Sequence, residues 1–218
     1  MALIQCPECN NEISDQARKC KFCGYPIRKS KTSKHKFGKK FIIIVACIFL
    51  LIAISIFVGY SVYTNQQKAA EKTYADNLSK AIMTINSGTS DAEYVGDLVY
   101  NVWYNSIFDK YDDDTLKYMG TTFNKSLENL FSDADFEEKV YNLDTTKKSA
   151  THYIKLLSSP SEKYKEPYND LKDYYASYVT LINLVSDPDG SLNSYTESYN
   201  DAKSDVERNY SPLEMYVN

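Results

Sequence analysis

The stretch FIIIVACIFLLIAISIFVGYSVY occupies residues 41–63 and contains no charged side chain in 23 consecutive positions. At about 1.5 Å of rise per residue it would form a helix roughly 34 Å long, enough to cross a hydrocarbon core about 30 Å thick. Tyr60 and Tyr63 stand at its C-terminal end, and aromatic side chains favour the membrane–water interface. The sequence therefore predicts one transmembrane helix at residues 41–63.

Two other interpretations of this stretch explain it less well. A buried helix of a soluble protein rarely runs this long without a polar face. A cleaved signal peptide would carry forty residues and a cysteine motif before its apolar run, and that run would be unusually long. We therefore expect the helix to remain in the protein. Cys47 lies within it, and we interpret this residue as a lipid-facing or helix-packing side chain, with acylation as the alternative.

The distribution of charge predicts the orientation of this helix. Residues 28–40 carry seven Lys or Arg and no acid, and such a segment next to a span stays in the cytoplasm. Residues 1–40 hold ten basic and three acidic side chains, a formal charge of +7, whereas the remaining 15 basic and 26 acidic side chains give −11. We expect a cytoplasmic N-terminus, a basic juxtamembrane linker at 28–40 that contacts the lipid bilayer, and an extracellular region at 64–218.

Four cysteines form two C-x-x-C pairs separated by ten residues: Cys6, Cys9, Cys20 and Cys23. Four thiolates match the closed tetrahedral site of structural zinc, and no position is left open for water. We therefore predict a structural Zn²⁺ held by these four side chains in a domain at residues 1–27. Residues that tolerate positive φ, Asn10 and Gly24, follow the two pairs, as turns of this kind require. Two disulfides, a redox pair and an iron site are the alternatives.

The segment at residues 4–27, which includes Cys6-Pro-Glu-Cys9-Asn10 and Cys20-Lys-Phe-Cys23-Gly24, resembles the short zinc-ribbon domain at the N-terminus of many bacterial proteins. The family usually has glycine after both cysteine pairs, and Asn10 departs from that pattern. The resemblance implies a structural zinc ion and a small interaction or regulatory module, often beside a membrane span. It covers 24 of the 218 residues and implies no substrate.

Residues 64–218 contain 17 of the 20 tyrosines and no cysteine. Their apolar side chains recur at spacings of three and four residues, which is typical of helices packed in a bundle. The sequence predicts an all-α outer domain, an antiparallel helical bundle of about six helices. The predicted helices contain apolar stripes at residues 74–85, 95–107, 116–130, 136–157, 164–185 and 192–206.

Polar and turn-forming residues separate these stripes. The sequence Ser-Gly-Thr-Ser at residues 87–90 is expected to divide the first two helices, with Thr89 or Ser90 as a cap. The other predicted boundaries are the three aspartates at 112–114, Ser132 or Asp133, the Ser-Ser-Pro-Ser sequence at 158–161, the Asp-Pro-Asp-Gly turn at 187–190, and Pro212.

Most of the tyrosines are predicted to pack with their hydroxyl groups at the edge of the core. Tyr174, Tyr175 and Tyr178 are the expected exception, because they point to more than one face of a helix. Together with the negative charge of the region, the tyrosines predict a surface that binds a protein partner or a cell-wall polymer.

Sequence motifs for catalysis are missing from the outer region. Its one histidine, His152, is interpreted as an exposed helix residue, and no nucleophile-elbow sequence accompanies it. The aspartates at 112–114 lack the glycine and distal glutamate of a calcium-binding EF-hand loop. Phosphate-binding, dinucleotide-binding and metalloprotease motifs do not occur in the sequence. We therefore expect no catalytic or cofactor-binding residues and a protein that is not an enzyme.

The layout as a whole resembles zinc-ribbon single-pass membrane proteins of Gram-positive bacteria, of the teicoplanin-resistance-associated type, although no outer-domain motif matches. The absence of outer cysteines favours the same cell envelope. We expect a cytoplasmic zinc-ribbon interaction module, with a cytoplasmic protein partner, joined to an extracellular binding or sensing domain. The alternative is a membrane-tethered nucleic-acid-binding regulator that uses the ribbon and residues 28–40. An envelope hydrolase is a third class.

Overall fold

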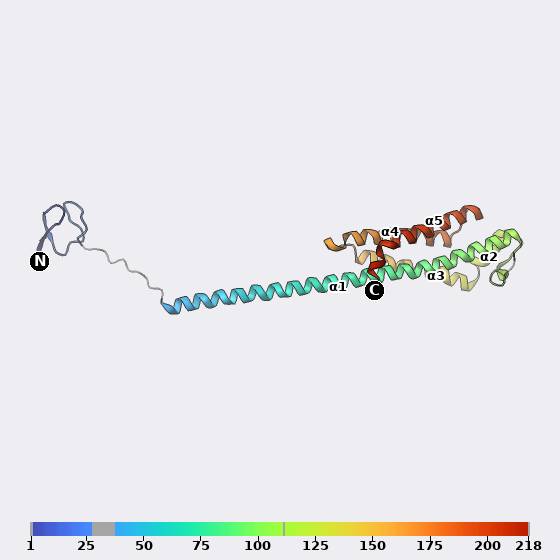
Figure 1. Cartoon of the computed structure of the whole chain (residues 1–218), viewed down its shortest axis with the longest axis horizontal. Coiled ribbons are helices and arrows are strands. Elements are labelled where there is room, and N and C mark those ends of the chain that lie inside the picture. Colours follow the sequence, from blue (N-terminus) through green and yellow to red (C-terminus); the bar gives the residue numbers. More distant parts are fainter. Residues whose placement is uncertain (1, 28–37, 111, 218) are drawn as a thin grey trace. The chain divides into compact units, whose positions relative to one another are not determined.

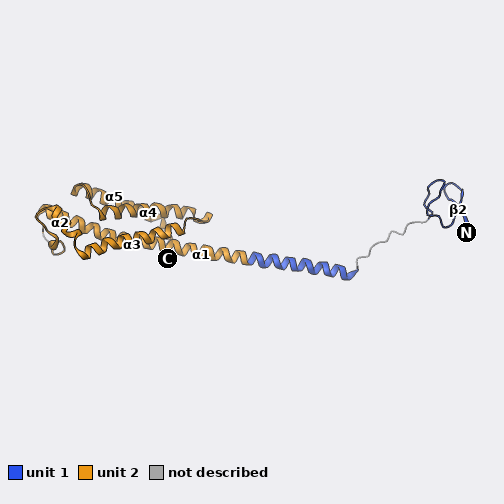
Figure 2. Cartoon of the chain, turned by 180° about the vertical axis from the view of Figure 1, so that it is seen from behind, with its two compact units in different colours: residues 1–61 blue, residues 62–218 orange. Residues whose placement is uncertain are grey.

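The computed structural model describes residues 2–27, 38–110 and 112–217 (Figure 1). The chain divides into two compact units, residues 1–61 and residues 62–218, which have different colours in Figure 2. The predicted basic linker at residues 28–40 lies outside the described residues except for positions 38–40.

The first unit begins with a two-stranded antiparallel sheet beside the cysteine cluster. β1 (Leu3–Gln5) pairs with β2 (Glu12–Ser14). Ile13 of β2 is only 2% exposed and packs with the buried side chains of Cys6 and Cys20. Because so few apolar side chains form this core, hydrophobic burial alone contributes little to the stability of the segment.

α1 (Lys39–Phe108) is a single helix of 70 residues that contains the whole stretch predicted to cross a membrane. An 18-residue window of this helix is strongly apolar, and none of that window is buried. By length and composition, α1 is therefore a candidate membrane-spanning helix.

The second unit is a helical bundle made from the C-terminal part of α1 and four further α-helices (Figure 2). In chain order these further elements are η1 (Leu116–Tyr118), α2 (Phe123–Phe131), α3 (Ala134–Leu156), η2 (Glu162–Tyr164), α4 (Lys165–Ser186), α5 (Leu192–Tyr210) and η3 (Ser211–Tyr216), of which the η elements are short 3₁₀ helices.

Contacts with α1 show the direction of the neighbouring helices. The hydroxyl of Tyr74 donates to the backbone oxygen of Leu157 at the end of α3, whereas Lys139 near the start of α3 lies over the ring of Tyr94. α3 is therefore antiparallel to α1. Short connections reverse the chain between α3 and α4 and again between α4 and α5 (Figure 1). The prediction that this part of the chain is mostly helical is confirmed, and its compact unit begins at residue 62.

The predicted break at residues 87–90 is wrong, because α1 continues through it. Gly88 is buried, and a Cβ atom at this position would overlap the side chain of Tyr178 from α4. Glycine therefore gives α4 room to approach and does not form a turn. The hydroxyl of Ser90 donates to the backbone oxygen of Asn86 at 3.3 Å, a bond that accommodates serine inside a helix. The first two predicted helices are one, and the described chain has five α-helices in all.

The next helix begins later than the sequence predicted. α2 starts at Phe123, and its N-cap is Thr122, whose side chain accepts a backbone N–H of the first turn. The predicted start at residues 112–114 is instead a turn before η1. The carboxylate of Asp112 accepts the backbone N–H of Thr115 at 2.8 Å and the side-chain amide of Asn105 at 2.6 Å. This aspartate therefore holds a turn in place.

Two other boundaries agree with the prediction. Asp133 is the N-cap of α3, and its carboxylate accepts the backbone N–H of Phe136 at 3.2 Å. The turn at residues 187–190 ends at Gly190, which has a φ of 88°. Ser191 and Ser194 then form a reciprocal capping box that begins α5.

Tyrosines fill much of the core of the second unit. Tyr174 and Tyr178 are fully buried, and Tyr175 is half-buried with its hydroxyl 2.6 Å from that of Thr151. The prediction that these three are an exception to core packing is therefore wrong. The reason is that α4 has neighbours on several sides, since it contacts α1, α3 and α5.

The buried tyrosine hydroxyls of α5 form hydrogen bonds with α1. The hydroxyl of Tyr195 donates to the backbone oxygen of Gly96 at 3.2 Å. The hydroxyl of Tyr199 lies 2.8 Å from both the backbone oxygen of Glu93 and the carboxylate of Asp97. Burial raises the pKa of both phenols above the usual value, so they are neutral at physiological pH. These bonds add directional contacts to the apolar packing between α1 and α5.

Candidate metal centre

Two turns with the same backbone hydrogen bond hold the two cysteine pairs. In the first, the backbone N–H of Asn10 donates to the backbone oxygen of Cys6 at 2.9 Å, and in the second Gly24 donates to Cys20 at the same distance. Asn10 has a φ of 56° and Gly24 a φ of 79°. The prediction that both positions need positive φ is confirmed, and asparagine, which tolerates this region, adopts it at the first turn.

The four sulfur atoms lie within 4.8 Å of one another. The Sγ atoms of Cys6 and Cys23 are 3.7 Å apart, and those of Cys9 and Cys20 are 3.6 Å apart. A disulfide bond is about 2.05 Å long, and all four are free thiols. A tetrahedral ion with bonds of about 2.3 Å to sulfur would place its ligands roughly 3.8 Å apart. The four predicted ligands are therefore close enough to hold one metal ion.

Hydrogen bonds and proximity move the thiol pKa values in opposite directions. Backbone and side-chain N–H groups of Asn11 donate to the sulfur of Cys9 and lower the pKa of this thiol to about 6. At Cys23 a backbone bond from Tyr25 favours the thiolate, but burial and the neighbouring thiols outweigh it and raise the pKa to about 12. Four thiolates this close repel one another unless a cation lies between them, which is the setting of a metal site.

The other residues singled out in the sequence do not join this cluster. Cys47 is exposed on α1. His152 is exposed on α3, as predicted, and its ring packs edge-on against that of Tyr153. Neither residue belongs to a group of metal-ligating side chains in the described parts of the chain.

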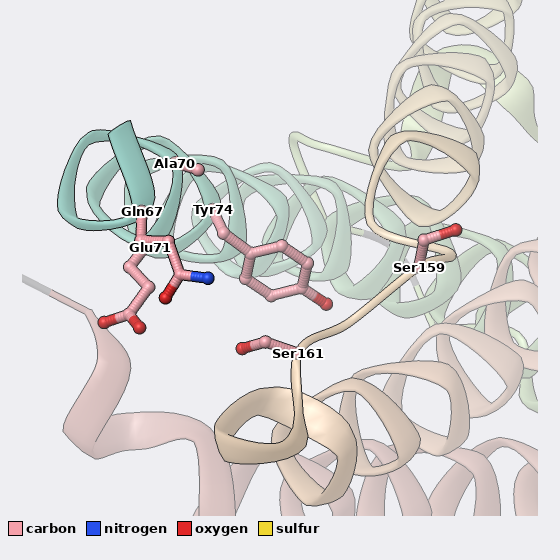
Figure 3. A pocket seen from close by; sticks show the side chains of 6 residues that line it. All are labelled: Gln67, Ala70, Glu71, Tyr74, Ser159 and Ser161. Atoms are coloured by element: carbon pink, nitrogen blue, oxygen red, sulfur yellow. The ribbon is translucent and has the colours of Figure 1, made fainter. Parts of the chain in front are cut away.

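The second unit contains a cleft that the sequence did not predict (Figure 3). Its volume is about 240 Å³. The ring of Tyr74 extends from α1 toward the loop between α3 and η2 (Figure 3). Helical spacing could not have revealed the cleft, because one of its walls is a loop more than eighty positions away in the sequence. The lining residues are Gln67, Ala70, Glu71, Tyr74, Ser159 and Ser161.

Comparison of the chain with models of known protein families, with curated proteins and with solved structures gave no match.

Proposed function

We propose that this chain is a single-pass protein of the cell envelope. In this proposal a cytoplasmic zinc ribbon at residues 1–27 is joined, through a membrane helix at 41–63, to an extracellular helical domain that binds a ligand or partner. The observation that carries the proposal is a cluster of four thiols in the same chain as an unburied apolar helix long enough to cross a bilayer.

The geometry of the cluster supports zinc as the metal. Two sulfur–sulfur distances of 3.6 and 3.7 Å are close to the edge of a ZnS₄ tetrahedron. All four ligands are thiolates, so the ion would have no open position for water and would act in folding. We assign Cys6, Cys9, Cys20 and Cys23 as the ligands of a structural Zn²⁺.

The distribution of charge supports the proposed orientation. The segment at 28–40 has seven basic residues and no acid, and such segments remain on the cytoplasmic side. A cytoplasmic location also keeps the thiols reduced and available for metal. The outer domain, with a formal charge of −11, would then lie outside and bind a protein or a wall polymer.

The ribbon gives less support to a nucleic-acid-binding regulator. Its described residues, 2–27, contain three acidic and three basic side chains, so the ribbon has no excess of positive charge before the thiolates are counted. Binding of the phosphate backbone depends on such an excess. We therefore propose a protein partner for the ribbon.

Labelling of intact cells with a membrane-impermeant maleimide tests the orientation. In a Cys47→Ala background, the ribbon thiols should react only after lysis and removal of metal by a chelator. Met215→Cys provides the matched outer position, because residue 215 is 78% exposed, and it should react on intact cells. Reaction of the ribbon thiols on intact cells, or protection of residue 215, would contradict the proposed orientation.

Metal analysis of the purified full-length chain tests the ribbon itself. We expect one zinc ion per chain, lost in Cys9→Ser and Cys20→Ser and retained in Cys47→Ser. Equal zinc content in all of these variants would rule out the assigned ligands.

A further inference from the structure

We propose that the cleft beside Tyr74 binds an ammonium group, as found in choline or ethanolamine, with Glu71 as its counter-charge and the Tyr74 ring as its aromatic wall. The proposal extends the proposed function by naming a ligand class for the outer domain, and its link to the membrane surface rests on that function.

The charge of the cleft favours a cation. Glu71 is the one charged side chain that lines it, as far as the described residues show, and the remaining polar groups are an amide and three hydroxyls. Two other clefts, of about 350 and 480 Å³, contain lysines as well as acids in their linings, and each has one more acid than lysines. Negative charge without a lysine in the lining is therefore a property of the cleft at Tyr74.

A cation of the chain itself already lies at the edge of this cleft. The ammonium of Lys163 is 3.8 Å from the carboxylate of Glu71 and 5.0 Å from the centre of the Tyr164 ring. Tyr164 in turn stacks on Tyr74, with ring centres 4.6 Å apart. A carboxylate beside aromatic faces is the arrangement that proteins use to bind alkylammonium ligands. Lys163 thus shows that the environment accepts an ammonium group, and it would compete with a ligand.

The polar groups of the cleft suit a small hydroxylated amine. Figure 3 shows the hydroxyl of Ser161 directed to the side of the cleft where Gln67 and Glu71 lie. The hydroxyl of Tyr74 donates to Leu157 and Tyr164 covers one face of its ring, so the ring offers a ligand its other face or its edge. A volume of about 240 Å³ lies below the range of about 300–1,000 Å³ typical of drug-sized ligands, so the cleft suits a smaller ligand.

The position of the cleft along α1 places it near a bilayer surface. Gln67 and Tyr74 are four and eleven residues beyond Tyr63, the last residue of the proposed span, and the side chain of Gln67 donates to the Tyr63 hydroxyl. At about 1.5 Å per residue the cleft lies roughly 6–17 Å beyond that residue. A head-group layer is about 5–8 Å thick, so only the end of the cleft at Gln67 lies within it. The ammonium could therefore belong to a lipid head group or to a soluble ligand at the surface.

Titration of the full-length chain in maltoside micelles tests the site. Choline with ¹³C-labelled methyl groups is the probe, its methyl signals are the readout, and its neutral tert-butyl analogue has the same shape without the charge. We expect saturable choline binding that the neutral analogue does not reproduce. Glu71→Gln should weaken binding about two- to fivefold, whereas Lys163→Gln, which removes the competing cation, should tighten it about two- to fivefold.

Weaker binding in Glu71→Gln and tighter binding in Lys163→Gln would distinguish a binding site from a structural contact. If the two residues only stabilised the fold, both substitutions would weaken choline binding. Glu128→Gln, at an exposed glutamate that pairs with Lys125, is the matched control and should leave binding unchanged. Equal binding of the neutral analogue, or unchanged binding in both Glu71→Gln and Lys163→Gln, would overturn the proposal.

The source of the ammonium is tested with short-chain phosphatidylcholine and phosphatidylethanolamine, compared with free choline and with short-chain phosphatidylglycerol. Tighter binding of the first two lipids would identify the membrane as the source, and equal binding of free choline would identify a soluble ligand. Tightest binding of phosphatidylglycerol would overturn the proposal.

Resistance of the chain to extraction from membranes by carbonate is measured in parallel. A chain that remains in the membrane but binds no ammonium would contradict this inference alone, whereas an extracted chain would contradict the proposed function.

Discussion

The side chain of Tyr178 in α4 lies directly against Gly88 of α1, so that a Cβ atom at position 88 would be 2.6 Å from Cζ of that ring and 2.9 Å from Cγ2 of Thr146. Three helices therefore meet at a residue without a side chain. The close approach explains why a glycine stands in the middle of a long helix, although glycine lowers helix stability by roughly 1 kcal/mol relative to alanine.

Gly88→Ala is expected to destabilise the bundle. The steric overlap should cost about 1–3 kcal/mol, and the better helix propensity of alanine offsets up to about 1 kcal/mol of this. Urea unfolding of the full-length chain in detergent, followed by circular dichroism, measures the change. Gly59→Ala is the control, because a Cβ there meets no atom within 4 Å. Equal stability of the two variants would show that Tyr178 does not pack on Gly88.

Two tyrosine-to-phenylalanine substitutions should differ in effect although both remove one buried hydroxyl. Tyr199→Phe loses contacts with the backbone oxygen of Glu93 and the carboxylate of Asp97, and should lower the free energy of unfolding by about 1–2 kcal/mol. Tyr178→Phe removes a buried hydroxyl that has no hydrogen-bond partner among the described residues, and should leave the free energy of unfolding unchanged or raise it. The same unfolding experiment compares them, and a larger loss in Tyr178→Phe would contradict the assigned bonds.

The bundle is expected to unfold in alkali. Burial, with smaller contributions from neighbouring tyrosines, raises the pKa of Tyr74 to about 12, and burial also raises the pKa of Tyr174, Tyr178, Tyr195 and Tyr199. A raised pKa means that the folded state holds the proton more tightly than the unfolded state. This stability is complete below the unfolded pKa of about 10 and is lost as pH rises through the folded pKa values.

The absorbance of phenolate and the circular dichroism of the helices should therefore change together as the pH rises above about 10. Ionisation of all tyrosines near pH 10 with full retention of helicity would contradict the prediction.

Zinc binding is expected to strengthen as pH rises and to release protons. The pKa of Cys9 is about 6, whereas that of Cys23 is about 12, so the metal-free cluster keeps at least one proton at neutral pH. Because zinc binds thiolates, it must displace that proton. Calorimetry in two buffers with different ionisation enthalpies counts the protons, and competition with a chromophoric chelator between about pH 6 and 8 measures the affinity. An affinity independent of pH would mean that all four thiols are already ionised.

Sequence patterns were sufficient to predict the structure where it depends on interactions between residues close in the sequence. The spacing of the cysteines and the positive φ at Asn10 and Gly24 depend on single turns, so the sequence alone predicts the cluster of four thiols. The caps at Asp133 and the turn ending at Gly190 also depend on neighbours within a few residues. Local signals failed at residues 87–90, where the reason for the glycine is a ring about ninety positions away.

The sequence by itself determined the cysteine cluster, the apolar helix at 41–63 and the helical class of residues 64–218, because turn chemistry, hydropathy and periodicity act over short distances. Tertiary structure alone decided that α1 continues through residues 87–90, that Tyr174 and Tyr178 are buried, and that Tyr74 and Glu71 form a cleft with the loop containing Ser159 and Ser161. These features depend on which helices become neighbours. The spacing of residues within one helix does not determine which distant segments pack against it.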